Sequence, residues 1–191
     1  MKTIILASTS PRRKELLEKI GLKFKVVESK HKEYLDPKLE PHELSKKISF
    51  EKAKAVFKKY KNCIIISADT FVVCSGIILG KPKDEKDAKR MLSLLSDKTH
   101  LVITGFTIID GSLDKAITEC SETKVYVRKI SPSEIDSYVK TKEPLGKAGG
   151  YAIQGIGSIF IQKVEGNYSN AVGLPIYALA RMLKKLGVEV L

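Results

Sequence analysis

Apolar residues in the first half of the chain recur in patterns that predict alternating strands and helices. Residues 3–6 form a short apolar run typical of a strand, and Leu16, Leu17 and Ile20 then recur at helical spacing. The pattern next predicts a strand over 24–28, a loop over 31–41, an amphipathic helix over 43–60, a buried strand over 63–68 and a helix over 84–95. Two short apolar runs around Ser75-Gly76 indicate a hairpin.

The second half has a stronger strand pattern. Long strands are expected over 101–109 and 117–128, separated by Asp110-Gly111, and shorter ones over 152–154 and 158–164. Ser131-Pro132-Ser133-Glu134 is a capping box that predicts a helix to Lys140, and a last helix is expected over 175–186. Adjacent strands with hairpin turns favour an α/β fold with a mixed or largely antiparallel sheet over a doubly wound one.

Composition limits the class of protein and its partners. The 191 residues suit one domain or two closely packed lobes, and we expect a single domain over 1–191. The net charge of +12 favours an anionic partner, although lysines scattered on helix faces also contribute to it. Three cysteines without a Cys-x-x-Cys pair, no signal peptide and no apolar run long enough for a membrane span predict a cytosolic protein.

The first candidate site follows the first strand. Ser10 is placed to cap a helix, and Pro11 suits its first position. Arg12 and Arg13 then stand in the first turn, where a helix disfavours cations. Serine, two guanidiniums and free backbone N–H groups together suit a phosphate. Taken alone, the arginines are more simply interpreted as solvated surface charges.

A second candidate is Asp69 in Ser67-Ala68-Asp69-Thr70, which we expect at the end of the buried strand. Ligands favour the strand ends of open sheets, so a carboxylate there could activate water or hold a cation. An aspartate that closes a strand by forming a turn is the simpler interpretation.

Three further positions carry chemistry that suits a nucleotide. Lys81 in Gly80-Lys81-Pro82 offers a point charge for phosphate, and Lys52 offers another unless it is a solvated helix lysine. Gln154 follows the glycine-rich stretch 147–153, and its amide can both donate to and accept from the imide edge of uracil or thymine. Each motif alone also fits an ordinary turn or helix face.

Together these motifs resemble the Maf family of nucleoside triphosphate pyrophosphatases. The resemblance covers residues 3 to about 180 and rests on ordered motifs, which are Leu6–Arg13, the Asp69-Thr70 pair with Gly80–Pro82, Ser96–Gly105, Lys147–Gly155 and Gly166–Pro175. It implies an elongated mixed sheet flanked by helices, with two lobes around a cleft, similar to inosine triphosphate pyrophosphatases. It also implies hydrolysis of a nucleoside triphosphate to the monophosphate and pyrophosphate.

The resemblance also implies roles for individual residues. Ser10, Arg12, Arg13, Lys52 and Lys81 would hold the triphosphate, and Thr70 and Gln154 would read the base. Asp69 would be catalytic, and Glu33 and Asp69 would bind Mg²⁺ or Mn²⁺, or Co²⁺. Arg12, Thr70 and Gln154 match the family branch that acts on dTTP and UTP rather than the branch for 7-methyl-GTP. CTP and modified pyrimidine nucleotides are further candidate substrates.

Partners and alternatives follow from the same resemblance. The family implies a homodimer, house-cleaning of nucleotide pools and an association with arrest of septum formation. One alternative is a house-cleaning pyrophosphatase for other noncanonical nucleotides, against which Gln154 argues. The other alternative is a nucleic-acid- or nucleotide-binding regulator of cell division, which the basic surface would serve. The chain lacks basic strands interleaved with aromatics, so nucleic acid is not the expected partner. A membrane is not expected either.

Three positions depart from the family pattern. Lys32 and Gly146 each replace a usual aspartate, and Asp97 replaces a usual glycine. Lys32 could alter metal affinity, and Gly146 removes a carboxylate near the site. None of them alters Arg12, Asp69 or Lys81.

Overall fold

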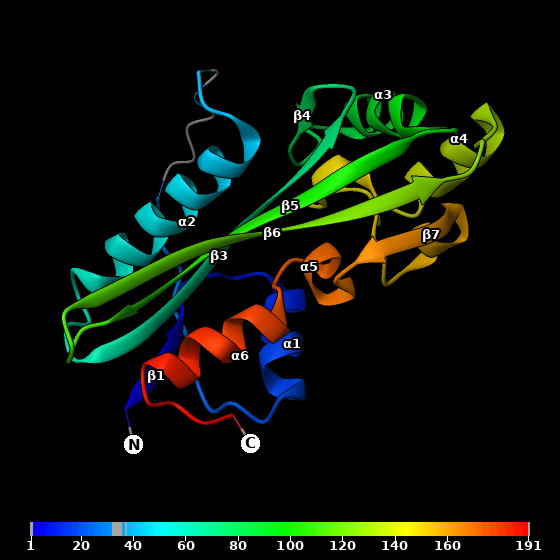
Figure 1. Ribbon diagram of the computed structural model, residues 1–191. Coiled ribbons are helices and arrows are strands. Elements are labelled where there is room, and N and C mark those ends of the chain that lie inside the picture. Colours follow the sequence, from blue (N-terminus) through cyan, green and yellow to red (C-terminus); the bar gives the residue numbers. More distant parts are fainter. Residues whose placement is uncertain (1, 32–35, 37, 191) are drawn as a thin grey trace. The chain divides into compact units, whose positions relative to one another are not determined.

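The computed structural model describes residues 2–31, 36 and 38–190, and it divides the chain into two compact units (Figure 1). Unit 1 comprises residues 1–69, 104–121 and 173–191, and unit 2 comprises residues 70–103 and 122–172. Each unit is therefore built from segments far apart in the sequence. Three long strands, β3, β5 and β6, contribute residues to both units.

The strands form one mixed sheet. Its members are β1 (Thr3–Leu6), β2 (Lys25–Val26), β3 (Cys63–Cys74), β4 (Ile77–Leu79), β5 (Thr99–Asp110), β6 (Lys115–Val127) and β7 (Ile161–Gly166). The order is β2-β1-β3-β5-β6-β7, and β4 pairs with β3. β1 pairs in parallel with β2 and β3, whereas the β3–β4 and β6–β7 pairs are antiparallel. The expected mixed α/β class is confirmed.

The helices are α1 (Pro11–Lys19), α2 (Pro41–Phe57), α3 (Glu85–Leu95), α4 (Pro132–Lys140), α5 (Tyr168–Val172) and α6 (Ile176–Lys185). Two 3₁₀ helices, η1 (Ala148–Gly150) and η2 (Ile156–Phe160), lie between α4 and β7. Pro11 starts α1 as expected, but the Ser10 side chain makes no capping hydrogen bond. The capping box of Ser131 and Glu134 forms in full at the start of α4.

In unit 1 the sheet is covered by helices on both faces (Figure 1). Ile5, Ile65 and Ile109 pack with Ala53 and Val56 of α2 on one face. Neighbouring residues of the strands point to the opposite face, where α1 and α6 lie in Figure 1. Burial on both faces explains why β1 and the start of β3 have continuous apolar runs.

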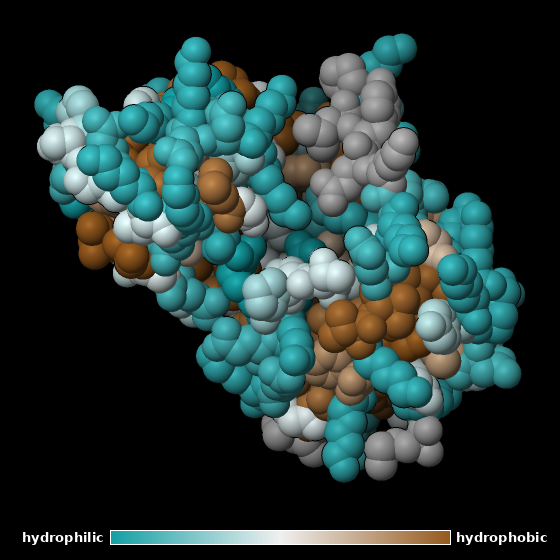
Figure 2. Space-filling model, turned by 180° about the vertical axis from the view of Figure 1, so that it is seen from behind, coloured by the Kyte–Doolittle hydropathy of each residue, from teal (hydrophilic) through white to brown (hydrophobic). Residues whose placement is uncertain are grey.

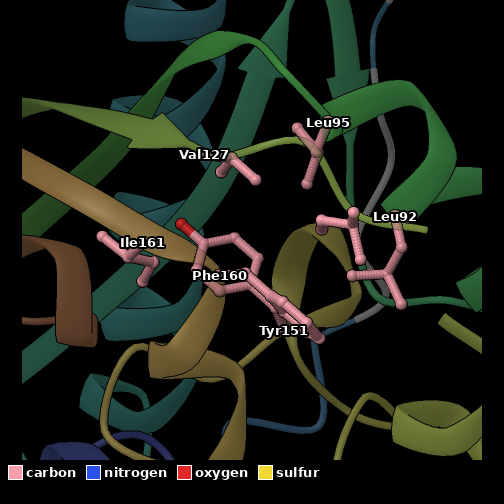
Figure 3. Close-up of a pocket in the computed structure, with 7 residues that line it drawn as sticks. Leu92, Leu95, Val127, Tyr151, Phe160 and Ile161 are labelled. Carbon is pink, nitrogen blue, oxygen red and sulfur yellow. The ribbon is translucent and has the colours of Figure 1, made fainter. Parts of the chain in front are cut away.

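Unit 2 has its own core, formed by β3, β5 and β6 with α3 and α4. It contains a cavity of about 10 Å³ between Leu92, Leu95, Val127, Ile130, Tyr151, Phe160 and Ile161, and the side chains labelled in Figure 3 surround it. Pockets for small-molecule ligands measure roughly 300–1,000 Å³. This apolar gap is therefore a minor packing defect of the core and has no room for a nucleotide.

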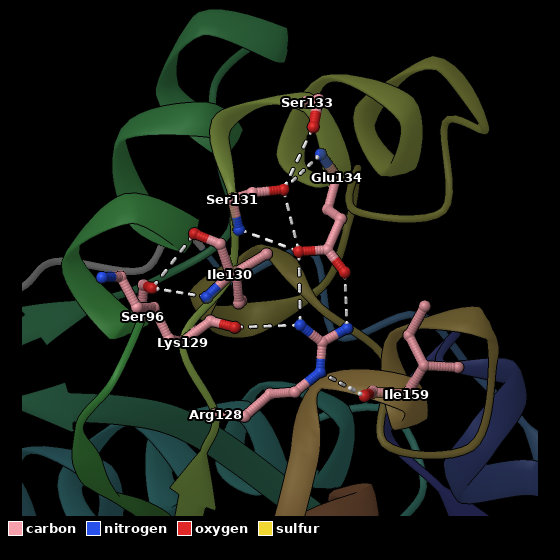
Figure 4. A network of polar contacts seen from close by, with 8 residues as sticks. All are labelled: Ser96, Arg128, Lys129, Ile130, Ser131, Ser133, Glu134 and Ile159. Carbon is pink, nitrogen blue, oxygen red and sulfur yellow. Dashed lines mark hydrogen bonds and ion pairs between the residues drawn. The ribbon is translucent and has the colours of Figure 1, made fainter.

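A polar network fixes the start of α4 in unit 2 (Figure 4). Arg128 binds both carboxylate oxygens of Glu134, and its Nε donates to the Ile159 carbonyl over 3.0 Å. The hydroxyl of Ser96 accepts from the Ile130 N–H over 2.8 Å. The network therefore joins α4 to η2 and to the end of α3.

The structure differs from the sequence-based expectations at several places. β3 runs without a break from Cys63 to Cys74, so Asp69 lies inside the strand and not at its end. Residues 152–154 form no strand, and η2 occupies part of the strand expected over 158–164. The short helix α5 was missed, because Tyr168–Val172 is too short for an apolar period to mark it.

The surface seen in Figure 2 is mostly hydrophilic, as the 34 lysines and arginines require. Brown areas interrupt it, and large apolar side chains that stay at least about half exposed include Ile159 and Tyr177. None of the helices in the described part of the chain combines the length and the apolar character that crossing a membrane requires.

Candidate active site

The central feature of unit 1 is a buried ion pair between α2 and β3. The Lys52 ammonium donates to Asp69 Oδ1, and the two side chains are only 9% and 7% exposed. Burying two charges costs several kcal/mol per ion, which a single ion pair offsets only in part. Lys52 is therefore not a solvated helix lysine, and Asp69 is not a turn residue.

The sequence brings α2 close enough to the sheet for this pair to form. A Cβ built on Gly105 of β5 would lie 2.2 Å from the Ser45 carbonyl carbon, so only glycine allows the helix backbone to approach. Ser49 of α2 then shares a hydrogen bond of 2.9 Å with Thr107, and the Ser67 hydroxyl donates to the Ser49 carbonyl over 2.5 Å. These short polar side chains fix the face of α2 that carries Lys52.

The start of α1 forms a second cationic feature of unit 1. Arg13 donates through Nε to the Gly173 carbonyl over 2.9 Å and through Nη1 to the Ser8 hydroxyl over 3.1 Å. It therefore joins the first motif of the chain to the last. Arg12 forms no hydrogen bond or ion pair with the described residues, and burial lowers the pKa of its guanidinium. A half-buried cation at a helix N-terminus is a suitable partner for an anionic ligand.

Unit 2 holds the remaining candidates. Thr70 follows Asp69 directly in β3 and is half-buried, and Lys81 is exposed just after β4, as the sequence predicts. Gln154 is exposed in a turn before η2. The structure thus joins Lys52 to Asp69 directly and groups Ser10, Arg12 and Arg13 at α1. It describes Thr70, Lys81 and Gln154 as parts of unit 2.

Two residues of unit 2 that the sequence reasoning missed contact the Gln154 turn. The Tyr138 hydroxyl donates to Glu143 Oε2 over 2.7 Å, and Glu143 accepts the N–H groups of Ile156 and Gly157. The available signal was the position of Glu143, four residues before the start of the glycine-rich motif at Lys147. Because no residue near Glu143 in the sequence is recognisable as its partner, the sequence gave no reason to select this carboxylate.

Other motif residues have structural roles. His100 is buried, its Nε2 lies 2.7 Å from the Tyr151 hydroxyl, and burial lowers its pKa to about 4. Asn170 of α5 donates to the Val102 carbonyl over 3.0 Å and to Thr123 Oγ1 over 2.9 Å. The Ser96–Gly105 and Gly166–Pro175 motifs therefore hold unit 2 together at these positions.

A metal site can be examined only in part. Glu33 and Lys32 lie outside the described residues. Within 2–31, 36 and 38–190, no three His, Cys, Asp or Glu side chains gather as a metal centre would require. Mg²⁺ is usually held by one or two carboxylates together with substrate phosphates, so the Asp69 carboxylate fits as one such ligand.

Backbone conformation bears on two of the positions at which the chain departs from the pattern described above. Asp97 has φ of 58° and Gly146 has φ of 77°, so both occupy the left-handed region. Glycine is favoured in that region, which accounts for a usual glycine at position 97 and for the glycine at position 146.

Comparison with known proteins gives consistent results along the whole chain. A protein of Caldicellulosiruptor saccharolyticus named dTTP/UTP pyrophosphatase is 46% identical and covers 100% of this chain and 98% of its own length. Proteins of the same name from Methanosarcina barkeri and Bacillus cereus are 48% and 47% identical, and they too cover 100% of this chain.

Solved structures with partial similarity include a nucleoside-triphosphatase / dITP/XTP pyrophosphatase from Mycobacterium abscessus, with a TM-score of 0.46 and 14% identity over 98% of this chain and 97% of that one. The Staphylococcus aureus Ham1 protein gives a TM-score of 0.47 at 14% identity over 84% and 80%. The family comparison is decisive, because residues 3–186 match a single family along almost the whole chain. The chain belongs to the Maf-like protein family.

Proposed function

We propose that this protein hydrolyses dTTP and UTP to the nucleoside monophosphate and pyrophosphate. The observation that carries the proposal is the 46–48% identity, over the whole chain, to proteins named dTTP/UTP pyrophosphatase. The buried Lys52–Asp69 pair supports it, because a pair that is expensive to bury is more easily explained by chemistry than by folding.

The reaction requires an activated water and neutralisation of phosphate charge. Water attacks the α-phosphorus, the bond between that phosphorus and the α–β bridging oxygen breaks, and pyrophosphate leaves. In this proposal Asp69 is the catalytic carboxylate and accepts the proton that the water releases. Lys52, in contact with Asp69 Oδ1, orients that carboxylate and adds positive charge near the phosphates.

The other candidate residues bind the substrate in this proposal. Ser10, Arg12, Arg13 and Lys81 contact the triphosphate, while Thr70 and Gln154 contact the base. Arg12 is the strongest of these candidates, since it is half-buried and has no partner in the described part of the chain. Arg13 has two of its donors on Gly173 and Ser8, so it also positions the loop before α1.

A divalent cation is part of the proposal. Asp69 would hold it together with Glu33 and the phosphates, and when bound it would neutralise charge on the leaving pyrophosphate. Mg²⁺, Mn²⁺ and Co²⁺ all suit oxygen donors. Dialysis against a chelator should abolish turnover, and graded addition of each ion should restore it. Full turnover after chelation would remove the cation from the proposal.

The deciding experiment is a substrate panel. The protein is incubated with Mg²⁺ or Mn²⁺ and dTTP, UTP, CTP, GTP, ITP or 7-methyl-GTP, and monophosphate and pyrophosphate are quantified. We expect rapid release of both products from dTTP and UTP. Cleavage confined to a purine nucleotide would overturn the assignment of Thr70 and Gln154 to the base.

Absence of cleavage with any nucleotide would overturn the proposed activity. A binding regulator of cell division would then be the better description, and it predicts nucleic-acid binding that weakens steeply with salt. The proposal also places the protein in the cytosol as a homodimer, which fractionation and sedimentation of the natural protein would test.

A further inference from the structure

The turn that carries Gln154 is held from both sides by one tyrosine–glutamate pair. The Tyr138 hydroxyl accepts the Ala152 N–H over 3.1 Å, two residues before Gln154. The same hydroxyl donates to Glu143 Oε2 over 2.7 Å. Tyr138 lies on α4 and is 2% exposed, so this contact is anchored in the core of unit 2.

Glu143 holds the other side of the turn. Its Oε1 accepts the Ile156 N–H over 3.0 Å and its Oε2 accepts the Gly157 N–H over 2.9 Å. Burial alone raises the pKa of Glu143, but the hydrogen bonds from Gly157, Tyr138 and Ile156 lower it overall. Burial and the bond to Glu143 raise the pKa of Tyr138, so its hydroxyl stays a donor. The pair therefore combines an ionised acceptor with a neutral donor.

Two glycines show that the contact is built into the sequence. A Cβ on Gly155 would lie 2.1 Å from Glu143 Oε1, and a Cβ on Gly157 would lie 2.6 Å from the Tyr138 hydroxyl. Gly155 has φ of −133°, so space and not backbone conformation demands a glycine there. Both glycines leave room for the carboxylate and the hydroxyl to reach the backbone.

Gln154 itself is exposed in the centre of this turn. An amide that distinguishes a uracil edge must present its carbonyl and its NH₂ in a fixed order, because the reversed order matches a different base. Residues 152 and 156 on either side of it are held by Tyr138 and Glu143. A turn held in this way loses little further conformational entropy when the base binds.

We infer that Glu143, held by Tyr138, is a positioning residue that orients Gln154 and thereby sets the preference for a pyrimidine imide over other bases. The inference rests on the proposed function, since it assigns Gln154 to the base. Glu143 does not touch the substrate in this scheme and acts only through the turn. Its loss should therefore affect the choice between bases more than the chemical step.

The test compares Glu143→Gln and Tyr138→Phe with matched variants elsewhere in unit 2. Tyr126 donates to Glu165 over 2.7 Å between β6 and β7, so Tyr126→Phe and Glu165→Gln remove a similar bond far from Gln154 in the sequence. The kinetic constants for UTP and CTP are measured for each variant and for the natural protein. CTP replaces the imide N–H of uracil with an acceptor, so it reports on orientation of the amide.

We expect Glu143→Gln and Tyr138→Phe to raise KM for UTP roughly tenfold with little change in kcat, the size expected for one lost hydrogen bond. The ratio of kcat/KM for UTP to that for CTP should fall by a similar factor, and the control variants should keep it. Equal losses with both nucleotides would show a merely structural role and would overturn the inference.

Hydrogen exchange separates this inference from the proposed activity. In the protein without nucleotide, the amides of Ile156 and Gly157 should exchange faster in Glu143→Gln than in the natural protein. We call the Tyr138–Glu143 pair, with its hydrogen bonds to this turn, the clamp. Unchanged protection of the two amides would overturn the inference that the clamp holds the turn, whatever the activity of the protein. If the natural protein cleaved no nucleotide, the proposed function would fail and the assignment of a base-reading role to the clamp would fail with it. If the natural protein cleaved UTP, but Glu143→Gln and Tyr138→Phe kept its ratio of kcat/KM for UTP to kcat/KM for CTP, only the inference about Glu143 and Tyr138 would fail.

Discussion

The two units each contain a prominent ion pair, and the pairs differ in nearly every physical respect. Lys52 and Asp69 in unit 1 are almost fully buried, with exposures of 9% and 7%, whereas Arg128 and Glu134 in unit 2 are 32% and 39% exposed. The buried pair joins one helix to one strand. The exposed pair is bidentate and lies within a network of backbone partners that fixes α4 (Figure 4).

The comparison indicates which charges serve folding and which serve chemistry. An exposed bidentate pair costs little desolvation and gains geometric definition from its fork of hydrogen bonds. A buried pair carries a large desolvation cost that packing of apolar residues would avoid. The unit 2 pair is therefore explained by the structure around it, and the unit 1 pair is explained by the hydrolysis that we propose.

The strongest way to break this comparison is to change Asp69. Asp69→Asn should lower turnover of UTP by roughly 10²–10⁴-fold, the contribution expected of a general base. Circular dichroism and gel filtration should show the same fold. Glu134→Gln, assayed in parallel, should keep most of the activity. Near-normal turnover in Asp69→Asn would remove Asp69 from the mechanism.

The next largest effect concerns stability. Lys52→Met alone should cost about 3–5 kcal/mol of unfolding free energy, because it leaves the Asp69 carboxylate buried without its cation. The double variant Lys52→Met/Asp69→Leu should recover most of that loss, since both charges are gone. Urea unfolding of the natural protein, the two single variants and the double variant gives the four free energies of a double-mutant cycle.

The corresponding double change in unit 2 sharpens the contrast. The double variant Arg128→Met/Glu134→Leu should not recover the unfolding free energy that its single variants lose. Ser131 and the Ile159 carbonyl lose hydrogen-bond partners in it as well. If this double variant were as stable as the natural protein, the network would have no structural role and the distinction between the pairs would fail.

Much of the fold could be predicted from periodicity and turn chemistry. The hairpin at Ser75-Gly76 forms with φ of 50° and 77°, as its residue types indicate, and the capping box at Ser131 forms completely. The continuous strand through Asp69 could not be predicted. Polar residues usually end strands, and here the contact with Lys52 allows the carboxylate to stay inside the sheet.

The candidate site was predictable in its residue types but not in its contacts. The sequence identifies Lys52 and Asp69 separately, yet their pairing depends on the approach of α2 to Gly105, a long-range contact. Glu143 could not be found in this way, because its carboxylate accepts from two backbone N–H groups in addition to the Tyr138 hydroxyl. Backbone partners leave no signature in side-chain identity.

A smaller effect concerns pH and the exposed pair. Hydrogen bonds from Arg128, and then from Ser131, lower the pKa of Glu134 from 4.5 to about 2. A lowered folded-state pKa gives stability that is present above the unfolded value and is lost as pH falls toward 2. Urea unfolding at pH 6, 4 and 3 should therefore show the gap between the natural protein and Glu134→Gln closing as pH falls. A gap that stayed constant would show that charge at Glu134 contributes nothing.

The smallest effect tests the backbone beside the exposed network. Asp97 has φ of 58°, and its N–H donates to the Arg128 carbonyl over 3.2 Å. Glycine removes the cost of the left-handed conformation but adds freedom to the unfolded chain, so Asp97→Gly should raise the unfolding free energy by only about 0.5 kcal/mol.

Asp97→Ala should have the opposite sign, because alanine tolerates the left-handed region less well than aspartate. Asp97→Asn should stay close to the natural protein, since asparagine tolerates that region and only the charge is lost. Thermal unfolding should resolve a shift of about 1–2 °C for the glycine variant. If Asp97→Asn gained as much stability as Asp97→Gly, the gain would come from removing the charge beside the Arg128–Glu134 network. Backbone strain at position 97 would then play no part in the gain.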